Sequence, residues 1–255
     1  MPVVVEDRQG IRLVTIDRPP VNALDVDTLQ ELANVLESAA ADGDVTGVVL
    51  TGTGKVMSAG ADLTKVLQGG DDYIDAGIDA LNRAFRTLFT FPKPVVAAVN
   101  GHALAGGAVL VCGCDHRVMG AGAGRIGVIE LTAGVPFPAW ALELVSHRVH
   151  SGYLEEVVLF GRAYEPEVAH RYGLIDEVVG DGAIMDVALD RARELAKVPR
   201  RTFFLTKRSL RAAAVANAEA LAAHDNEVKE AWRSPEVRAA IERQMAALRG
   251  SAATG

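Results

Sequence analysis

Cysteine is scarce in this chain of 255 residues, and its only two cysteines, Cys112 and Cys114, are separated by a single residue. Two cysteines this close on a regular element rarely meet the geometry of a disulfide, so a disulfide framework is not expected. A zinc site is not expected either, because no second cysteine pair and no H-E-x-x-H segment is present. We therefore expect two reduced, buried thiols in a cytoplasmic protein that binds no metal.

Long hydrophobic runs and an excess of positive charge are also missing. Residues 1–10 include acidic side chains and no long apolar run, so they do not resemble a signal peptide. The stretch 94–114 carries no Asp, Glu, Lys or Arg, but its proline, its asparagine and its four glycines favour a buried strand, a turn and a buried helix over a membrane span. A formal charge of -7 and a pI of about 5.4 argue against nucleic acid or an anionic membrane as a partner.

Several common motifs of nucleotide binding and catalysis do not occur. The segment 52–55 (G-T-G-K) lacks the spacing of a phosphate-binding loop, and no G-x-G-x-x-G motif follows an expected strand. Ser58 has no glycine two positions before it, so it does not match a nucleophile elbow. We interpret Lys55, Lys65 and Lys207 by default as solvated surface charges.

The chain contains enough apolar residues to form a large hydrophobic core. Apolar residues make up 49% of the sequence and charged residues 23%, close to the average of globular domains. The length suits one large domain, or one domain with a small appendage. No Ser/Gly-rich or Pro-rich linker divides it. We expect a core over residues 1–195 and a helical C-terminal region over residues 196–255 that is not an independent domain.

Strands alternate with helices through the first part of the chain. We expect strands over 3–6, 11–16, 45–51, 94–99 and 115–119, and helices over 27–41, 73–89 and 106–112, with a short segment at 63–67. The recurring strand–strand–helix order indicates an α/β fold with mostly parallel strands. After about residue 154 the pattern is mainly helical. We expect helices there over 188–196, 202–214 and 218–248, the last interrupted at Ser234-Pro235.

Three segments combine glycines with the ends of expected elements: 57–63 (M-S-A-G-A-D-L), 94–107 (P-V-V-A-A-V-N-G-H-A-L-A-G-G) and 126–136 (I-G-V-I-E-L-T-A-G-V-P). The first two carry a strand into a glycine-containing turn at its carboxyl end, where open α/β sheets bind ligands. Gly106 and Gly107 also begin a helix, whose free N–H groups favour a negative oxygen. Together, two such turns can place two unpaired N–H groups side by side. For either turn alone, a change of chain direction is the simpler explanation.

In this order and spacing, the segments resemble the crotonase superfamily, also called the enoyl-CoA hydratase/isomerase family. The similar segments are 20–24 (P-V-N-A-L), 47–62 (G-V-V-L-T-G-T-G…S-A-G-A-D), 93–101 (K-P-V-V-A-A-V-N-G), 114–118 (C-D-H-R-V), 161–163 (G-R-A) and 173–179 (G-L-I-D-E-V-V). The resemblance spans nearly the whole chain. It implies a crotonase-like spiral of repeated ββα units, a helical C-terminal trimerisation region, and a homo-trimer or a hexamer built as a dimer of trimers.

The resemblance also implies an acyl-CoA thioester substrate, no permanently bound cofactor, and stabilisation of a thioester enolate. Carried over by position, the backbone N–H groups of Ala61 and Gly106 form the oxyanion hole, and Glu130 is the catalytic carboxylate. The positions expected to contact the substrate or its CoA portion are Val21, Ala23, Leu24, Ala59, Gly60, Asp62, Leu63, Gly107, Val109, Leu131 and Gly134.

The sequence departs from the hydratase pattern at one important position. Hydratases of this family use two glutamates, and the first lies three residues after the oxyanion glycine, where this chain has Val109. Valine can neither activate water nor donate a proton. Glu130 is retained between Ile129 and Leu131, and apolar surroundings should raise its pKa. We therefore favour Δ3–Δ2 enoyl-CoA isomerisation, in which one carboxylate suffices.

Other activities stay open at this point. The dienoyl-CoA isomerase variant places an acid where this chain has Pro138, so that activity is not supported. A hydratase could recruit another acid, with Asp62 and Glu143 as the candidates nearby in sequence. The chain could also be a catalytically silent acyl-CoA binding protein, which the valine at position 109 would favour.

Overall fold

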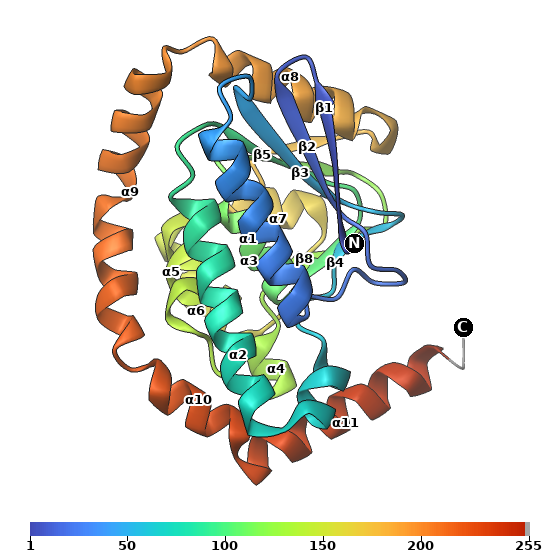
Figure 1. Ribbon diagram of the computed structural model, residues 1–255. Coiled ribbons are helices and arrows are strands. Elements are labelled where there is room, and N and C mark those ends of the chain that lie inside the picture. The colour runs from blue at the N-terminus through green and yellow to red at the C-terminus, as the bar shows by residue number, and fades with distance from the viewer. Residues whose placement is uncertain (253–255) are drawn as a thin grey trace.

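The main sheet contains six strands in the order β1-β2-β3-β5-β7-β9 (Figure 1). The computed structural model describes the backbone of residues 1–252 and the side chains of residues 1–247. Only β1 and β2 pair antiparallel, as a hairpin, and every later neighbour pairs parallel. The strands are β1 (Val3–Arg8), β2 (Ile11–Ile16), β3 (Gly47–Gly52), β5 (Val95–Val99), β7 (His116–Gly120) and β9 (Glu177–Val179).

A second, smaller sheet is parallel and has the order β4-β6-β8. Its strands are β4 (Val56–Ser58), β6 (His102–Leu104) and β8 (Ile126–Gly127). Each follows a strand of the main sheet, and each is followed by one of the helices α2 (Leu63–Phe89), α3 (Gly106–Gly113) and α4 (Glu130–Ala133). Three consecutive ββα units therefore add one strand to each sheet in turn, which confirms the α/β fold and the crotonase-like spiral expected from the sequence.

The two faces of the main sheet are covered by different helices because side chains alternate along each strand. Val48 and Leu50 of β3 lie in the large core with α1 (Val26–Ala41), α2 and α3, whereas Val49 packs with α8 (Ile184–Ala196) on the opposite face. Burial on both faces explains why β3 and β5 are almost continuously apolar.

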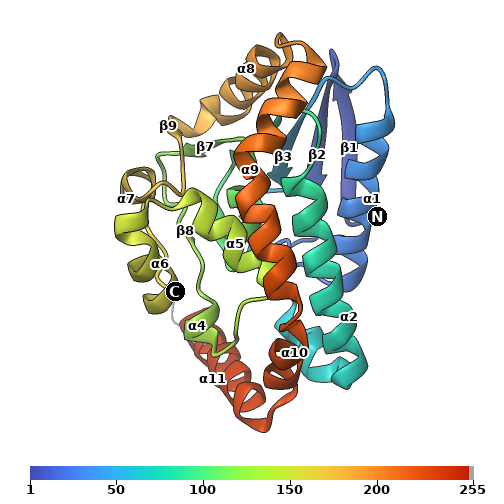
Figure 2. The ribbon, with the colours of Figure 1, turned by 90° about the vertical axis from the view of Figure 1, so that its left-hand side faces the viewer.

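The remaining elements lie in the second half of the chain. They are α5 (Ala139–Arg148), α6 (Leu154–Phe160), α7 (Pro166–Tyr172), α9 (Arg200–Ala222), α10 (Asp225–Arg233) and α11 (Pro235–Ala252), with short 3-10 turns at Ser151–Tyr153 and Asp181–Ala183. Figures 1 and 2 show α9 running along one side of the molecule, with α10 and α11 passing beneath the end of α2. Among the described residues, no helix combines the length and hydrophobicity needed to cross a bilayer.

Several element boundaries differ from the sequence expectation. The helix expected over 202–214 extends to Ala222, because no glycine or proline interrupts the alanine-rich stretch after it. The expected segment 63–67 and helix 73–89 are two parts of α2, which bends at Gly70 with a φ of 70°. The start of the expected helix 218–248 is wrong, because residues 218–222 belong to α9 and α10 begins at Asp225, whereas its break at Ser234-Pro235, between α10 and α11, is confirmed. Residues 253–255 of the expected C-terminal region lie outside the described residues.

A buried ionic cluster fastens α9 to the sheet. Asp115, at the start of β7, accepts hydrogen bonds from Lys207 and Arg211 of α9, each at 2.7 Å, and from the backbone N–H of Val95 at 2.8 Å. The interpretation of Lys207 as a solvated charge is therefore wrong: it is buried, and burial lowers its pKa to about 8. No local pattern indicates this burial, because the partners are 92 and 96 positions apart.

Both cysteines are free and buried, as expected. Burial raises the pKa of the Cys112 thiol to about 11 and that of the Cys114 thiol to about 12. Since the thiolate is the reactive form, neither side chain has the exposure or the acidity of a reactive cysteine.

The ionic cluster leads to a stability prediction. Asp115→Asn removes the negative charge from two buried cations, so we expect a loss of about 3–5 kcal/mol in the free energy of unfolding. Urea denaturation followed by circular dichroism measures it. The matched control is Glu219→Gln, which breaks the exposed Arg86–Glu219 pair and should cost less than about 1 kcal/mol. Equal losses in the two variants would contradict a structural role for the buried cluster.

Candidate active site

Two turns, one after β4 and one after β6, are in direct contact. Gly60 has a φ of 86°, and a Cβ atom built on it would lie 2.7 Å from Ala105 Cβ and 3.0 Å from Gly106 N. Real Cβ atoms do not approach other atoms so closely, so only glycine allows this approach. The contact brings Ala61, which follows Gly60, beside the first residue of α3.

Ala61 and Gly106 each present a backbone N–H group that no acceptor among the described residues satisfies. Gly106 is the first residue of α3, where an N–H group has no partner within the helix. Ala61 forms a parallel bridge with Leu24, but that bridge uses the N–H groups of Leu24 and Asp62 instead. The two free donors therefore lie on turns that contact each other.

Ala105 holds the second turn in an unusual backbone conformation. Its φ of 48° and ψ of -128° are rare for a residue with a side chain, and such strain costs about 1–3 kcal/mol. Hydrogen bonds fix both sides of it: its N–H donates to Gly127 O at 2.9 Å, and its carbonyl accepts from Val109 N at 3.1 Å. The fold therefore holds the residue just before the Gly106 donor in a set orientation.

Glu130, the first residue of α4, is a buried acid with little hydrogen bonding. Its side chain is only 7% exposed, and its Oε2 atom has no partner among the described residues. Burial raises the pKa of the carboxyl to about 8, opposed weakly by a hydrogen bond from its own backbone N–H. An acid whose pKa lies close to neutrality can both take up and release a proton.

These groups share one cavity of about 440 Å³, a size typical of small-ligand sites. Among the described residues that line it, Glu130 is the only carboxylate, and the other polar side chains are His102 and Gln244. Val21 and His102 are exposed, so they mark the mouth. Much of the lining is buried and apolar, and this part includes Leu81, Phe85, Val135, Pro138, Ala141 and Trp232.

Of the residues expected from the sequence, Val21, Ala59, Ala61, Leu63, Gly106 and Glu130 line this large cavity. The others lie around it. Val109 is fully buried in the main core, and Leu131 is 44% exposed. Gly60 and Gly107 are in the backbones of the two turns, Ala23 accepts a hydrogen bond from Arg18, and Gly134 ends α4.

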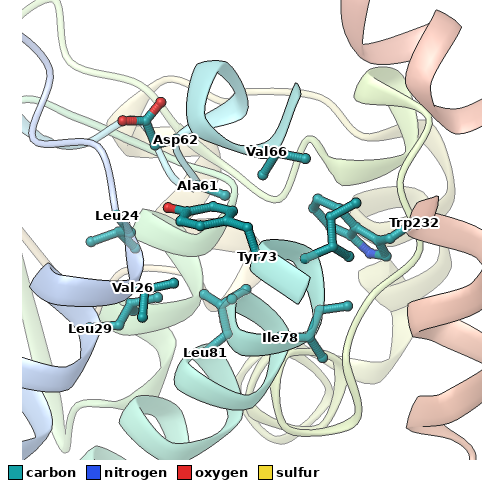
Figure 3. Close-up of a pocket in the computed structure, with 12 residues that line it drawn as sticks. Leu24, Val26, Leu29, Ala61, Asp62, Val66, Tyr73, Ile78, Leu81 and Trp232 are labelled. Atoms are coloured by element: carbon teal, nitrogen blue, oxygen red, sulfur yellow. The ribbon is translucent and has the colours of Figure 1, made fainter. Parts of the chain in front are cut away.

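A small cavity of about 20 Å³ adjoins the large one, and Leu24 and Asp62 line it (Figure 3). The two cavities share the lining residues Ala61, Leu81 and Trp232, which we call the partition. Asp62 has a structural role here, because its side chain caps α2 by accepting from Lys65 N and pairs with Arg18 at 2.7 Å. Lys65 in turn pairs with Asp25 at 2.6 Å.

Sequence reasoning missed Leu81, Trp232, His102 and Gln244. Trp232 lies in α10 and Gln244 in α11, about 100 positions or more from the turns that they face. Apolar residues near Trp232 and Gln244 indicate that one face of each helix is packed. Helical periodicity does not indicate which part of the protein that face packs against. His102 lies in the turn segment after Asn100-Gly101. Only the glycines and the backbone N–H groups of that segment, not its histidine, indicated a ligand site in the sequence.

Comparison with known proteins gives a consistent result. The sequence model of the family "Enoyl-CoA hydratase/isomerase" matches residues 6–244. The chain is 31% identical over 210 residues to 2,3-dehydroadipyl-CoA hydratase of Escherichia coli (strain K12), which covers 82% of this chain and 81% of that protein.

Solved structures of similar fold carry both isomerase and hydratase descriptions. Human mitochondrial Δ3-Δ2-enoyl-CoA isomerase superposes with a TM-score of 0.90 at 25% identity, over 98% of this chain and 99% of that one. A protein of Mycobacterium tuberculosis described as an enoyl-CoA isomerase superposes with a TM-score of 0.79 at 33% identity, over 88% of this chain and 96% of that one. A second solved structure of the same protein, with a TM-score of 0.80, is described as a probable enoyl-CoA hydratase.

The contact between the two turns leads to a second prediction. Gly60→Ala must adopt a left-handed backbone and also displace Ala105 and Gly106, so we expect a loss of about 2–5 kcal/mol in the free energy of unfolding. Gly54→Ala is the matched control. Gly54 has a φ of 73°, but a Cβ atom added to it would have no neighbour within 4 Å, so only the backbone cost of about 1–2 kcal/mol applies. Equal unfolding midpoints in urea would show that the turns do not constrain each other.

Proposed function

The chain belongs to the enoyl-CoA hydratase/isomerase family, and from this membership and the geometry of its site we propose that it converts 3-enoyl-CoA thioesters to 2-enoyl-CoA thioesters. The observation that carries the proposal is the presence of one carboxylate, Glu130, on the described lining of a cavity that also holds two free backbone donors. Moving a double bond by one position requires a single group that removes a proton and returns it.

In the proposed reaction, the thioester oxygen accepts hydrogen bonds from the N–H groups of Ala61 and Gly106. Glu130 removes a proton from C2, and the electrons of that C–H bond form the C2=C3 double bond of the product. The electrons of the former C3=C4 bond take up the proton that Glu130 returns at C4. The dienolate between these two steps carries its charge on the thioester oxygen, where each donor contributes roughly 3–4 kcal/mol.

The orientation of the substrate follows from the exposure of the cavity lining. The CoA portion is large and polar, so it extends through the mouth past Val21 and His102. The acyl chain packs against the buried, apolar part of the lining. This orientation places the thioester between the two turns and Glu130, with C2 and C4 on the side of the carboxylate.

Hydration of a 2-enoyl-CoA is the alternative reaction within the family, and two of the similar proteins are named hydratases. The hydratase pattern needs a second acid, and position 109 is a buried valine here. Neither suggested replacement lines the large cavity: Asp62 caps α2 and pairs with Arg18, and Glu143 lies on α5 outside the lining. The human structure is described as an isomerase, which supports isomerisation, whereas the M. tuberculosis protein is described as an isomerase in one solved structure and as a probable hydratase in another.

We also propose that the protein assembles as a trimer or a dimer of trimers, as the family resemblance implies. Large apolar side chains that are exposed on one subunit support an assembly: Leu159, Phe160, Leu205, Leu210 and Leu221, on α6 and α9. The cytoplasmic location expected from the two unpaired cysteines stays a prediction.

The first test is Glu130→Gln. The amide cannot accept the C2 proton, so kcat for conversion of 3-hexenoyl-CoA should fall by roughly 100- to 10,000-fold while the Kd for a saturated acyl-CoA changes little. Absorbance of the conjugated thioester product follows turnover, and calorimetry gives Kd. Glu143→Gln makes the same change outside the cavity and should retain activity. Full activity of Glu130→Gln, or addition of water to crotonyl-CoA at a comparable rate, would rule out the proposal.

The second test uses the pH dependence of kcat/KM. Glu130 must be ionised to act as a base, and burial raises its pKa to about 8. Activity should therefore be low when the carboxyl is protonated and rise tenfold per pH unit up to a midpoint near 8. His102→Asn removes the other titratable side chain of the lining and should leave that midpoint in place. A profile that is flat from about pH 6 to about pH 9 would contradict the assignment of the base.

A further inference from the structure

The turn after β4 has four backbone N–H groups, in residues 59–62, and a side chain satisfies one of them. Two of the four donate to carbonyl groups of the neighbouring segment 21–24, each at 3.0 Å. The N–H of Gly60 donates to the hydroxyl oxygen of Ser58 at 3.1 Å. That of Ala61, which belongs to the partition, has no acceptor among the described residues. The Ser58 hydroxyl therefore leaves Ala61 with the one free N–H of this described turn.

The Ser58 hydroxyl is fixed on both sides. It donates its single hydrogen to Asn22 O at 2.8 Å, so its lone pairs remain to accept from Gly60 N. Asn22 is itself held, because its side-chain amide donates to Thr53 O at 3.0 Å and to Val56 O at 2.7 Å. Ser58 and Asn22 are both fully buried, so water does not replace either bond.

The bonds around Gly60 set the direction of the Ala61 N–H. Gly60 O accepts from Leu24 N at 2.8 Å, and the planar peptide that carries this carbonyl also carries the N–H of Ala61. The two groups of a trans peptide point in opposite directions, so the Ala61 N–H points away from Leu24 (Figure 3). The Ser58 hydroxyl holds the preceding peptide. Both peptide planes that meet at Gly60 are therefore fixed.

Ser58 also contacts the second turn. A Cβ atom built on Gly107, the residue after Gly106, would lie 2.4 Å from Ser58 O and 2.8 Å from Ser58 Cβ. The backbone at the start of α3 therefore packs directly on Ser58. One residue thus contacts the turn of each free donor, with its hydroxyl on the first and its main chain and Cβ on the second.

We propose that Ser58 is a positioning residue, whose hydroxyl orients the Ala61 N–H toward the thioester oxygen. The inference rests on the proposed binding of that oxygen by Ala61 and Gly106, whichever reaction follows. Without the hydroxyl, the N–H of Gly60 loses its acceptor in a buried place, which is costly. The peptide before Gly60 then rotates toward another acceptor, and the Ala61 donor turns with it. A displaced donor stabilises a developing oxyanion less, although the substrate still fits the cavity.

The kinetic test is Ser58→Ala. It should lower kcat for 3-hexenoyl-CoA by roughly 10- to 100-fold and change KM by less than about threefold, because the lost stabilisation belongs to the transition state. Ser58→Cys fills the same place with a weaker donor and acceptor and should lose less activity. It carries the test if Ser58→Ala does not fold.

The matched control is Thr51→Val. Thr51 has a buried hydroxyl in the same ββα unit, which donates to Ala98 O at 2.8 Å, and it is not among the described lining residues of either cavity. Both Thr51→Val and Ser58→Ala should unfold at lower urea concentrations, since each loses a buried hydrogen bond. Only the change at Ser58 should lower kcat.

A spectroscopic readout measures the donors without turnover. Infrared difference spectra of a bound saturated acyl-CoA, isotope-labelled at its thioester carbonyl, give the stretching frequency of that C=O group. Binding to wild-type protein should lower the frequency, because two N–H donors polarise the carbonyl. Ser58→Ala should lower it less, Ser58→Cys should lie between, and Thr51→Val should match wild-type protein.

The outcomes separate this inference from the proposed reaction. Wild-type kcat and carbonyl frequency in Ser58→Ala, or equal changes in Thr51→Val, would overturn the positioning role alone. If the frequency depends on Ser58 but 3-enoyl-CoA is not isomerised, the proposed reaction is wrong and the positioning role holds. If binding to wild-type protein leaves the frequency unchanged, the pair of donors does not bind the carbonyl and both proposals are wrong.

Discussion

The site depends on the contact between two turns, in which Gly60 packs against Ala105 and the backbone of Gly106. This contact joins the first ββα unit to the second at the level of the small sheet, and it fixes where the two unpaired N–H groups lie. Strand pairing of β4 with β6 brings the turns together, and the absence of a side chain at Gly60 lets them touch. A repeated unit therefore produces a site that no single unit contains, because each turn supplies one donor.

Glu130 is stabilised poorly for a buried acid, which fits the proton transfer that we propose for it. The number of hydrogen bonds distinguishes Glu130 from a structural carboxylate of the same protein. Asp115 accepts hydrogen bonds from two cationic side chains and a backbone N–H, whereas Oε2 of Glu130 has no partner among the described residues. Its ionised form is therefore costly, and the cost can be relieved when a proton arrives from a substrate. Functional sites commonly keep such unfavourable groups, which the rest of the fold must offset.

The parts of the site that are local could be predicted from the sequence. Strands that end in glycine-containing turns, the start of α3 at Gly106, and an acid between apolar neighbours at Glu130 can all be seen in short segments. The rest depends on packing between distant segments. The sequence around Lys207 does not distinguish it from a surface lysine, because its partner Asp115 is distant in the chain. The sequence around Trp232 likewise does not indicate the cavity that this residue lines. Helix periodicity identified the C-terminal helices, but not what they cover.

Those C-terminal helices pack against the short helix that carries Glu130. Trp232 of α10 and Ile241 of α11 pack in one apolar cluster with Ala133 of α4, the short helix that begins with Glu130. Ala240 of α11 also lies close to Gly134: a Cβ atom built on Gly134 would be 2.5 Å from the Cβ atom of Ala240. This packing contributes to the burial of the helix that begins with Glu130, and burial is what raises the pKa of its carboxyl. A change that opens this packing would therefore act on the environment of the acid although it lies more than 100 positions away in the sequence.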